Sequence, residues 1–282
     1  MVPGAAECRG PPGEIRPDHR LRLRLREPAG QAAGRAGPAG AGGLSHPAGG
    51  GAAEGGDVGV AATVILDVTR TDSIAAATAW VKEQVGDKGL WGLVNNAGIA
   101  IPFAPNEWLT KDDFVKVLEV NLIGLIEVTL SVLPLVKRAR GRVVNYGMEA
   151  FSDSLRREML PFGVKVCVIE PGYFHTAITN PQLINESSTR LWERLPDETK
   201  ASYGESYLHA FIRATHSMQK YCHADLSIVT GCMGHALMAR HPRTRYSAGW
   251  DAKLLFLPLS YLPTWFADFV LTWSYPVPAQ KV

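Results

Sequence analysis

Several features that would point to common classes of protein are missing from this sequence. The sequence has no large excess of one charge sign, because 29 basic residues and 27 acidic residues give a net charge of +2. We therefore expect no nucleic-acid partner. The four cysteines lack metal-ligand spacing, and Cys167 lies in an apolar run typical of a core strand, so we expect no metal site. No apolar run of signal-peptide or membrane-span length opens the chain.

The first 62 residues also lack Phe, Tyr and Trp, although they hold 15 of the chain's 28 glycines. Such a segment cannot bury enough apolar surface to offset chain entropy, so we predict disorder for residues 1–62 and a folded domain over residues 63–282. Arg20, Arg22, Arg24 and Arg26 alternate with leucines. That alternation leaves open an edge strand, a targeting peptide or a contact with an anionic surface.

From residue 63 the chain alternates between short apolar runs and helical periodicity, which predicts an α/β fold. We predict strands at residues 63–67, 90–95, 142–145 and 164–170, lying as neighbours in one parallel sheet. We predict helices at residues 72–85, capped by Asp72, at 112–136, and at 146–160. The apolar face of the second helix is predicted to contain Phe114, Leu118, Leu122 and Leu125. Residues 177–240 are predicted to be mostly helical, and their histidines, His223 among them, show no ligand-like pairing.

Polar and small residues follow several of these strands, as they do where a ligand lies against the carboxyl edge of a sheet. Residues 91–98 read WGLVNNAG, so Asn95, Asn96, Ala97 and Gly98 end a strand, although Asn-Asn-Ala-Gly alone is a plain turn. Asp67 and Val68 close the strand upstream. Further along are a mid-helix Asn121 and the turn PGYFHT, which contains Pro171, Gly172 and Thr176.

This set of motifs, at this order and spacing, resembles the short-chain dehydrogenase/reductase family. The strings EAFSDSLRRE (149–158), IEPGYF (169–174) and HPRTRYSAGWDAKLL (241–255) narrow the resemblance to its retinol and 17β/3α-hydroxysteroid dehydrogenase branch. The likeness covers residues 63–282. It implies a Rossmann-type doubly wound parallel sheet, NAD as cofactor, a lipophilic alcohol (retinoid or steroid) as substrate, and location at the endoplasmic reticulum membrane. Because the apolar N-terminal anchor of that branch is missing here, a cytosolic location is the alternative.

The resemblance also assigns roles to residues of this sequence. It implies that Asn121 bends its helix and holds a water of the proton relay. It implies that one set of residues contacts the cofactor: Asp67, Val68, Asn95, Asn96, Ala97, Gly98, Pro171, Gly172 and Thr176.

The family's serine and its Tyr-x-x-x-Lys are missing. Asn145 is followed directly by Tyr146, which begins a stretch of sequence that in the family lies after the catalytic lysine. None of the eight tyrosines of this chain has a lysine four residues later. A free tyrosine, with a pKa of about 10, is a poor base at neutral pH unless a nearby positive charge lowers that pKa. General base catalysis contributes about 10²–10⁴-fold. Tyr146 has no lysine partner, so we expect it to pack or face solvent.

The family's glycine-rich phosphate loop is missing too. HRLRLRLREP (19–28) can be encoded so that the next reading frame gives TGCDSGFGN, which resembles that loop in the form typical of the retinol branch. We therefore hypothesise that residues before about 63 are a frame-shifted translation of the first βαβ unit. The predicted fold is then a Rossmann-type sheet that lacks its first βαβ unit and its Ser/Tyr/Lys segment.

The C-terminal segment, residues 254–273, is strongly apolar and aromatic, and Pro258, Pro263 and Asp268 interrupt it. A straight membrane span is thereby disfavoured, which leaves an interfacial or substrate-rim segment, or packing against the core. Two hypotheses for function follow. The chain is an NAD-dependent oxidoreductase of a lipophilic alcohol, or it is catalytically inactive, either as a splice or gene-model product or as a pseudoenzyme that at most binds partners or lipid. The missing catalytic residues favour inactivity of this chain, whereas the resemblance favours the oxidoreductase for its parent gene.

Overall fold

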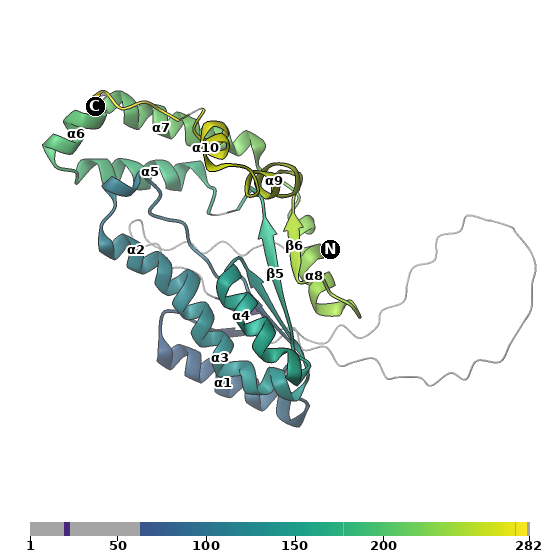
Figure 1. Cartoon of the computed structure of the whole chain (residues 1–282). Helices are drawn as coiled ribbons and strands as arrows, with labels where there is room; N and C mark the ends of the chain where they lie inside the picture. Colours follow the sequence, from purple (N-terminus) through teal and green to yellow (C-terminus); the bar gives the residue numbers. More distant parts are fainter. Residues whose placement is uncertain (1–19, 23–62, 177, 274, 281–282) are drawn as a thin grey trace, which may run out of the picture.

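The computed structural model describes residues 20–22, 63–176, 178–273 and 275–280 (Figure 1). Most of the segment for which we predict disorder and a frame-shifted origin lies outside these residues. Arg20–Arg22 forms β1, which pairs antiparallel with β2, Thr63–Ile65. These three residues are extended, as in the edge-strand interpretation, and the disorder prediction for residues 1–62 stays a prediction.

The central sheet is parallel and has the strand order β3-β4-β5-β6. Its strands are Gly92–Asn95, Arg142–Tyr146, Lys165–Pro171 and Arg245–Ala248. Three of the four predicted strands are therefore neighbours, as expected. The prediction for residues 63–67 is wrong in two respects, because β2 ends at Ile65 and pairs with β1 instead of joining this sheet. β6 was not predicted.

One edge of the described sheet is β3. The N–H of Arg142 donates to the carbonyl of Trp91, and Gly92 lies opposite Arg142 in the register. In a parallel ladder this arrangement turns the backbone N–H and C=O of Gly92 and Val94 away from β4. Within the described residues, no second strand pairs with that outer edge.

Helices cover both faces of the sheet, as a doubly wound fold requires. α1 (Thr71–Val85), α3 (Leu125–Arg138) and α4 (Glu149–Met159) pack on one face around a core that includes Leu93, Val136 and Val143. α8 (Ser227–Met238) packs on the other face over β4, β5 and β6 (Figure 1). Short 3-10 turns occur at Gly86–Lys88, Asn106–Trp108, Leu160–Phe162 and Gln219–Tyr221.

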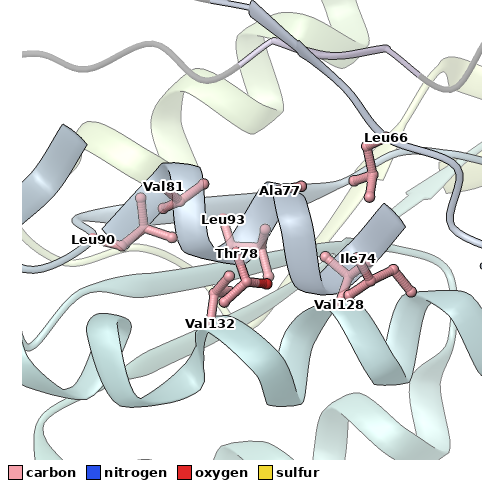
Figure 2. A pocket seen from close by; sticks show the side chains of 9 residues that line it. All are labelled: Leu66, Ile74, Ala77, Thr78, Val81, Leu90, Leu93, Val128 and Val132. Carbon is pink, nitrogen blue, oxygen red and sulfur yellow. The ribbon is translucent and has the colours of Figure 1, made fainter. Parts of the chain in front are cut away.

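The start of α1 differs from prediction. Ile74, Ala77, Val81 and Val85 are buried as the periodicity predicts. Asp72, however, lies in the first turn and does not cap the helix; it pairs instead with Arg70, the N-cap residue. Between α1, β3 and α3 there is an apolar cavity of about 10 Å³, room for at most one water (Figure 2). Its lining is Leu66, Ile74, Ala77, Thr78, Val81, Leu90, Leu93, Val128 and Val132.

The predicted helix at residues 112–136 is a continuous run made of α2 (Lys111–Leu118), a π-helical turn (Glu119–Gly124) and α3. The predicted apolar face is wrong for Phe114 and Leu118, which are 44% and 49% exposed. Asp113 is buried instead, because it forms a capping box with Thr110. By length and composition alone, Lys111–Arg138 could cross a membrane, but its inner side belongs to the core of this fold.

The region from 181 to 221 is mostly helical, as predicted, and forms a separate layer beside the sheet (Figure 1). It contains α5 (Pro181–Glu193), α6 (Asp197–Tyr203) and α7 (Glu205–Met218), which pack around the buried Trp108. The C-terminal segment continues with a π-helix (Ala252–Phe256), α9 (Leu257–Leu259) and α10 (Thr264–Thr272). No residue of α10 is buried, so packing against the core does not account for this helix.

Candidate functional site

The carboxyl ends of β3 and β5 lie at one edge of the sheet, separated by β4. Asn96, Ala97 and Gly98 follow β3 and are exposed, and Pro171 and Gly172 end or follow β5 and are half-buried. In open α/β sheets this edge is where ligands bind. The structure thus brings together two of the segments that sequence analysis assigned to one site.

Asn121 lies in the π-helical turn and is bonded to the loop after β3. Its Oδ1 accepts the N–H of Ile99, and its Nδ2 donates to the carbonyl of Ile99, both at 2.8 Å. A Cβ on Gly98 would lie 3.5 Å from the Asn121 Oδ1. The paired hydrogen bonds hold the exposed segment in place, while the bend that the resemblance implies at Asn121 stays a prediction. Its part in a proton relay stays a prediction.

Asn95 lies in the core. It is 6% exposed, and its Nδ2 donates to Thr129 Oγ1 and to Asn145 Oδ1, each at 2.8 Å. Asn145 in turn donates to Ser152 Oγ at 2.9 Å. These bonds join β3, α3, β4 and α4 in one buried polar network. The Asn95 side chain is therefore engaged in the core, and its contact with a cofactor stays a prediction.

Asp67 and Val68 lead from β2 into α1. The Asp67 Oδ1 accepts both the N–H and the hydroxyl of Thr69, and the N–H of Asp67 donates to Ser73 Oγ. Val68 is buried against the π-helical turn, where a Cβ on Gly124 would lie 2.4 Å from the Val68 carbonyl oxygen. Val68 therefore packs tightly, while Asp67 remains half-buried near the surface.

The turn after β5 is held by two residues that sequence analysis did not assign to the site, Asp251 and His223. Asp251 is 4% exposed; its Oδ2 accepts the N–H of Tyr173 at 2.7 Å, and its Oδ1 accepts the N–H of Ala252 at 2.9 Å. His223 Nε2 lies 3.1 Å from the same Oδ1. Thr176 is exposed and its N–H donates to Thr179 Oγ1. The string GWDAKLL contains Asp251, but no local pattern relates it to His223, 28 residues away.

The connection between β4 and α4 is very short. β4 ends at Tyr146 and α4 begins at Glu149, so Gly147 and Met148 alone join them. Both adopt left-handed backbone conformations, with φ of 73° and 60°. Glycine adopts this region freely, whereas a Met there is strained. The predicted helix at 146–160 has thus lost its first turn, while Leu155 and Met159 on its inner side are buried.

Tyr146 is the tyrosine nearest to the place where the family has its base. Its side chain is 39% exposed, and partial burial raises the pKa of its hydroxyl above the usual value. A catalytic tyrosine needs the opposite shift, with a cation nearby. The surroundings of Tyr146 therefore do not suit it to act as a base.

The residues present fit a dinucleotide only in part. Asn96–Gly98 and the 171–176 turn could lie along its two ends, as in other open α/β sheets. A glycine-rich loop at a helix N-terminus, which would hold the pyrophosphate, is not found among residues 63–280. No group of three or more His, Cys, Asp or Glu side chains suited to a metal ion is found in the described residues.

Fold and site together define a Rossmann-type α/β protein with a site at the carboxyl edge of its sheet, the class to which nucleotide-dependent oxidoreductases belong. The model of the short chain dehydrogenase family matches residues 52–147. A solved short-chain dehydrogenase from Streptomyces avermitilis shares the fold, with a TM-score of 0.52 and 22% identity over 74% of this chain and 77% of that one.

Similarity to curated relatives shows which branch of the family the chain belongs to. Retinol dehydrogenase 16 of Homo sapiens is 57% identical over 239 residues, and retinol dehydrogenase 7 of Rattus norvegicus is 55% identical. 17-beta-hydroxysteroid dehydrogenase type 6 of Homo sapiens is 54% identical. Each match covers 78% of this chain and 75% of the relative. This chain belongs to the short-chain dehydrogenase/reductase family, in its retinol and hydroxysteroid dehydrogenase branch.

Proposed function

We propose that this chain is a form of an NAD-dependent oxidoreductase of lipophilic alcohols, retinoid or steroid, that does not itself transfer hydride. The observation that carries the proposal is the two-residue connection between β4 and α4. The serine and the Tyr-x-x-x-Lys of the family belong at that connection, and Gly147 and Met148 leave no room for them. Without a base and a cation beside it, the hydroxyl proton of the alcohol has no acceptor when the hydride leaves.

Two features of the comparisons support a segment lost at this connection. The family match ends at residue 147, beside Met148. The 239 aligned positions shared with retinol dehydrogenase 16 outnumber the residues of this chain that they cover, which are 78% of 282. The relative therefore has a segment inside the aligned region that this chain lacks.

The proposal is tested by turnover. The purified chain should oxidise neither retinol nor 3α- or 17β-hydroxysteroids with NAD above a no-enzyme control. Restoring both the Ser/Tyr-x-x-x-Lys segment after Asn145 and the glycine-rich unit before residue 63 should recover activity, whereas either repair alone should not, because such residues act as a unit. Turnover by the unrepaired chain that disappears in Tyr146→Phe would overturn the proposal.

The proposal includes weak cofactor binding. Asn96–Gly98 and the 171–176 turn remain, but the described residues lack the backbone amides that bind a pyrophosphate. Calorimetry should give no saturable NAD binding at millimolar cofactor. A micromolar isotherm would contradict this part of the proposal without bearing on the missing base.

The proposal also places the chain on a bilayer surface, at the endoplasmic reticulum, through its C-terminal segment. Large apolar side chains are exposed there: Leu254, Leu257, Tyr261, Leu262, Trp265, Phe266, Phe269, Leu271, Trp273, Tyr275 and Val277. α10 has nine residues and is about 14 Å long, too short for a hydrocarbon core of about 30 Å. Trp and Tyr are enriched at the level of lipid headgroups, so the segment suits an interfacial position.

Vesicle co-sedimentation tests this attachment. The chain should sediment with phosphatidylcholine vesicles, and Trp265→Ser combined with Trp273→Ser should release most of it. Trp91→Ser is the matched control, because Trp91 is also exposed but lies at the opposite end of β3 from the site. Equal release by the control would refute attachment through residues 254–273.

A further inference from the structure

A single buried carboxylate joins three distant segments at the end of β5. Asp251 accepts N–H groups from Tyr173, in the turn after β5, and from Ala252, at the start of the C-terminal segment, and it contacts His223, which follows the helical layer. Buried carboxylates persist where hydrogen bonds replace the lost water. The three partners are therefore held together by one ionisable group.

His223 strengthens the same junction through its backbone and its ring. Its N–H donates to the carbonyl of Tyr173, and its carbonyl accepts the N–H of His175. Its imidazole contacts the rings of Phe174 and Trp250, with centroid distances of 5.0 and 6.1 Å. Two aromatic neighbours thus help to orient the ring, whose Nε2 lies 3.1 Å from Asp251 Oδ1.

At Gly172 the turn after β5 comes so close to the Asp251 carboxylate that no side chain fits between them. A Cβ on Gly172 would lie 1.9 Å from Asp251 Oδ1 and 2.1 Å from Oδ2, far inside van der Waals contact. Gly172 does not have a positive φ, so its backbone would admit alanine. The requirement for glycine at this position therefore comes from Asp251 and not from the conformation of the turn.

The junction also reaches the exposed C-terminal segment. The rings of Tyr173 and Phe256 meet edge to face, with centroids 5.4 Å apart. Phe256 ends the π-helix that Asp251 precedes, and β5 and β6 both run toward this helix and α9 (Figure 1). The turn and the aromatic segment therefore share one rigid connection.

We propose that Asp251, oriented by His223, is a positioning residue that fixes the 171–174 turn against the C-terminal segment. The importance of this turn for a nicotinamide ring rests on the proposed function. We call the contacts of Asp251 with Tyr173, Ala252 and His223 the clamp. These contacts belong to this chain and do not depend on whether the chain binds NAD.

Hydrogen exchange in the full chain tests the clamp at one atom. The Tyr173 amide should be protected, and its proton resonance should lie downfield because it donates to a carboxylate. In Asp251→Ala that resonance should move upfield and exchange should quicken at least about tenfold, while amides of Val166 and Val168 in the core of β5 keep their rates. Asp268→Ala, at an exposed aspartate of α10, should leave Tyr173 unchanged.

A double-mutant cycle tests the steric part. Gly172→Ala should lower the melting temperature of the native chain by several degrees and should cost much less in the Asp251→Ala background, where the clash is removed. If Asp251→Ala does not fold, Asp251→Asn replaces it, since its amide keeps one of the two acceptor oxygens and should give an intermediate exchange rate. Additive effects in the cycle, or an unchanged Tyr173 amide, would overturn the proposal. Failure of NAD binding or turnover would change neither readout.

Discussion

Asn95 and Asn145 face each other across neighbouring strands, with Asn95 Nδ2 2.8 Å from Asn145 Oδ1. Both side chains are buried, and Thr129 and Ser152 each accept a further hydrogen bond from this pair. Hydrogen bonds between buried amides help to hold β3 and β4 in one register, and the loss of one amide removes a bond from each of its partners. The pair therefore lies at the base of the carboxyl edge where the site is built.

Replacing Asn145 should show how much the buried hydrogen bonds between β3 and β4 contribute to stability. Asn145→Ala removes one of the hydrogen bonds of Asn95 and one of those of Ser152, so we expect a loss of about 1–3 kcal/mol in the free energy of unfolding. Asn96→Ala, at the exposed neighbour of Asn95, should change it by less than about 0.5 kcal/mol. Urea denaturation measures both. A comparable loss in the two variants would mean that the network does not stabilise the fold.

Replacing Met148 with glycine should stabilise the fold. Its left-handed conformation costs a side chain roughly 1 kcal/mol or more, so Met148→Gly should raise the free energy of unfolding by about that amount. Gly147→Ala makes the opposite change at the preceding residue and should lower the free energy of unfolding. Thermal melts of the two variants should therefore shift in opposite directions, and a destabilised Met148→Gly would show that the Met148 side chain contributes more than its backbone costs.

Gly124 and Gly231 should respond in opposite ways to the same substitution. A Cβ on Gly124 would meet the Val68 carbonyl oxygen at 2.4 Å, so Gly124→Ala should lose about 1–3 kcal/mol in stability. Gly231 lies inside α8 with no heavy atom within 4 Å of such a Cβ, so Gly231→Ala should gain about 0.5–1 kcal/mol. Circular dichroism melts compare them directly, and a neutral Gly124→Ala would show that Val68 can move away from the π-helical turn.

Asp113 should make stability depend on pH in the acid range. Burial acts to raise the pKa of its carboxyl, but the Thr110 N–H and the Arg194 guanidinium outweigh burial and hold that pKa below its usual value. A lowered pKa contributes stability above the unfolded value of about 3.9, and the contribution is lost as pH falls through the folded value. Asp113→Asn should therefore cost about 1 kcal/mol at pH 7 and progressively less as the pH falls below the unfolded value.

Asp112→Asn is the control for that measurement. Asp112 lies in the same helical turn but is exposed and takes no part in the capping box. Denaturation curves at pH 7 and pH 3 should show a pH-dependent difference for Asp113→Asn alone. If the cost at Asp113 were the same at both pH values, its role would be packing and not charge.

Local pattern was enough for the elements whose burial follows a simple period. The stripe of Ile74, Ala77, Val81 and Val85 and the apolar runs of β3, β4 and β5 could be read directly, because burial repeats with the geometry of a helix or strand. Phe114 was assigned to the wrong face because a capping aspartate and a π-helical turn took the buried positions. β6 has only four residues and no apolar run, so only its partner β5 marks it as a strand.

The candidate site was less accessible to prediction. Asn121, Asn96 and the 171–176 turn could be proposed because they lie within or directly after predicted elements at family spacing. Asp251 could not, because its partners Tyr173 and His223 lie 78 and 28 residues away and no local pattern records the contact. The role of Asn95 was also hidden, since an Asn that ends a strand can face either a ligand or the core.

The open outer edge of β3 has a consequence for how this chain would fare in a cell. In the part of the chain that the structure describes, no strand pairs with the backbone groups of Gly92 and Val94 beside the exposed Trp91, and natural sheets protect such edges because they template pairing between chains. During synthesis that edge is available to any extended segment nearby, including those of other nascent chains. The amount of this protein in a cell should therefore be governed by chaperones and degradation more than by its rate of synthesis.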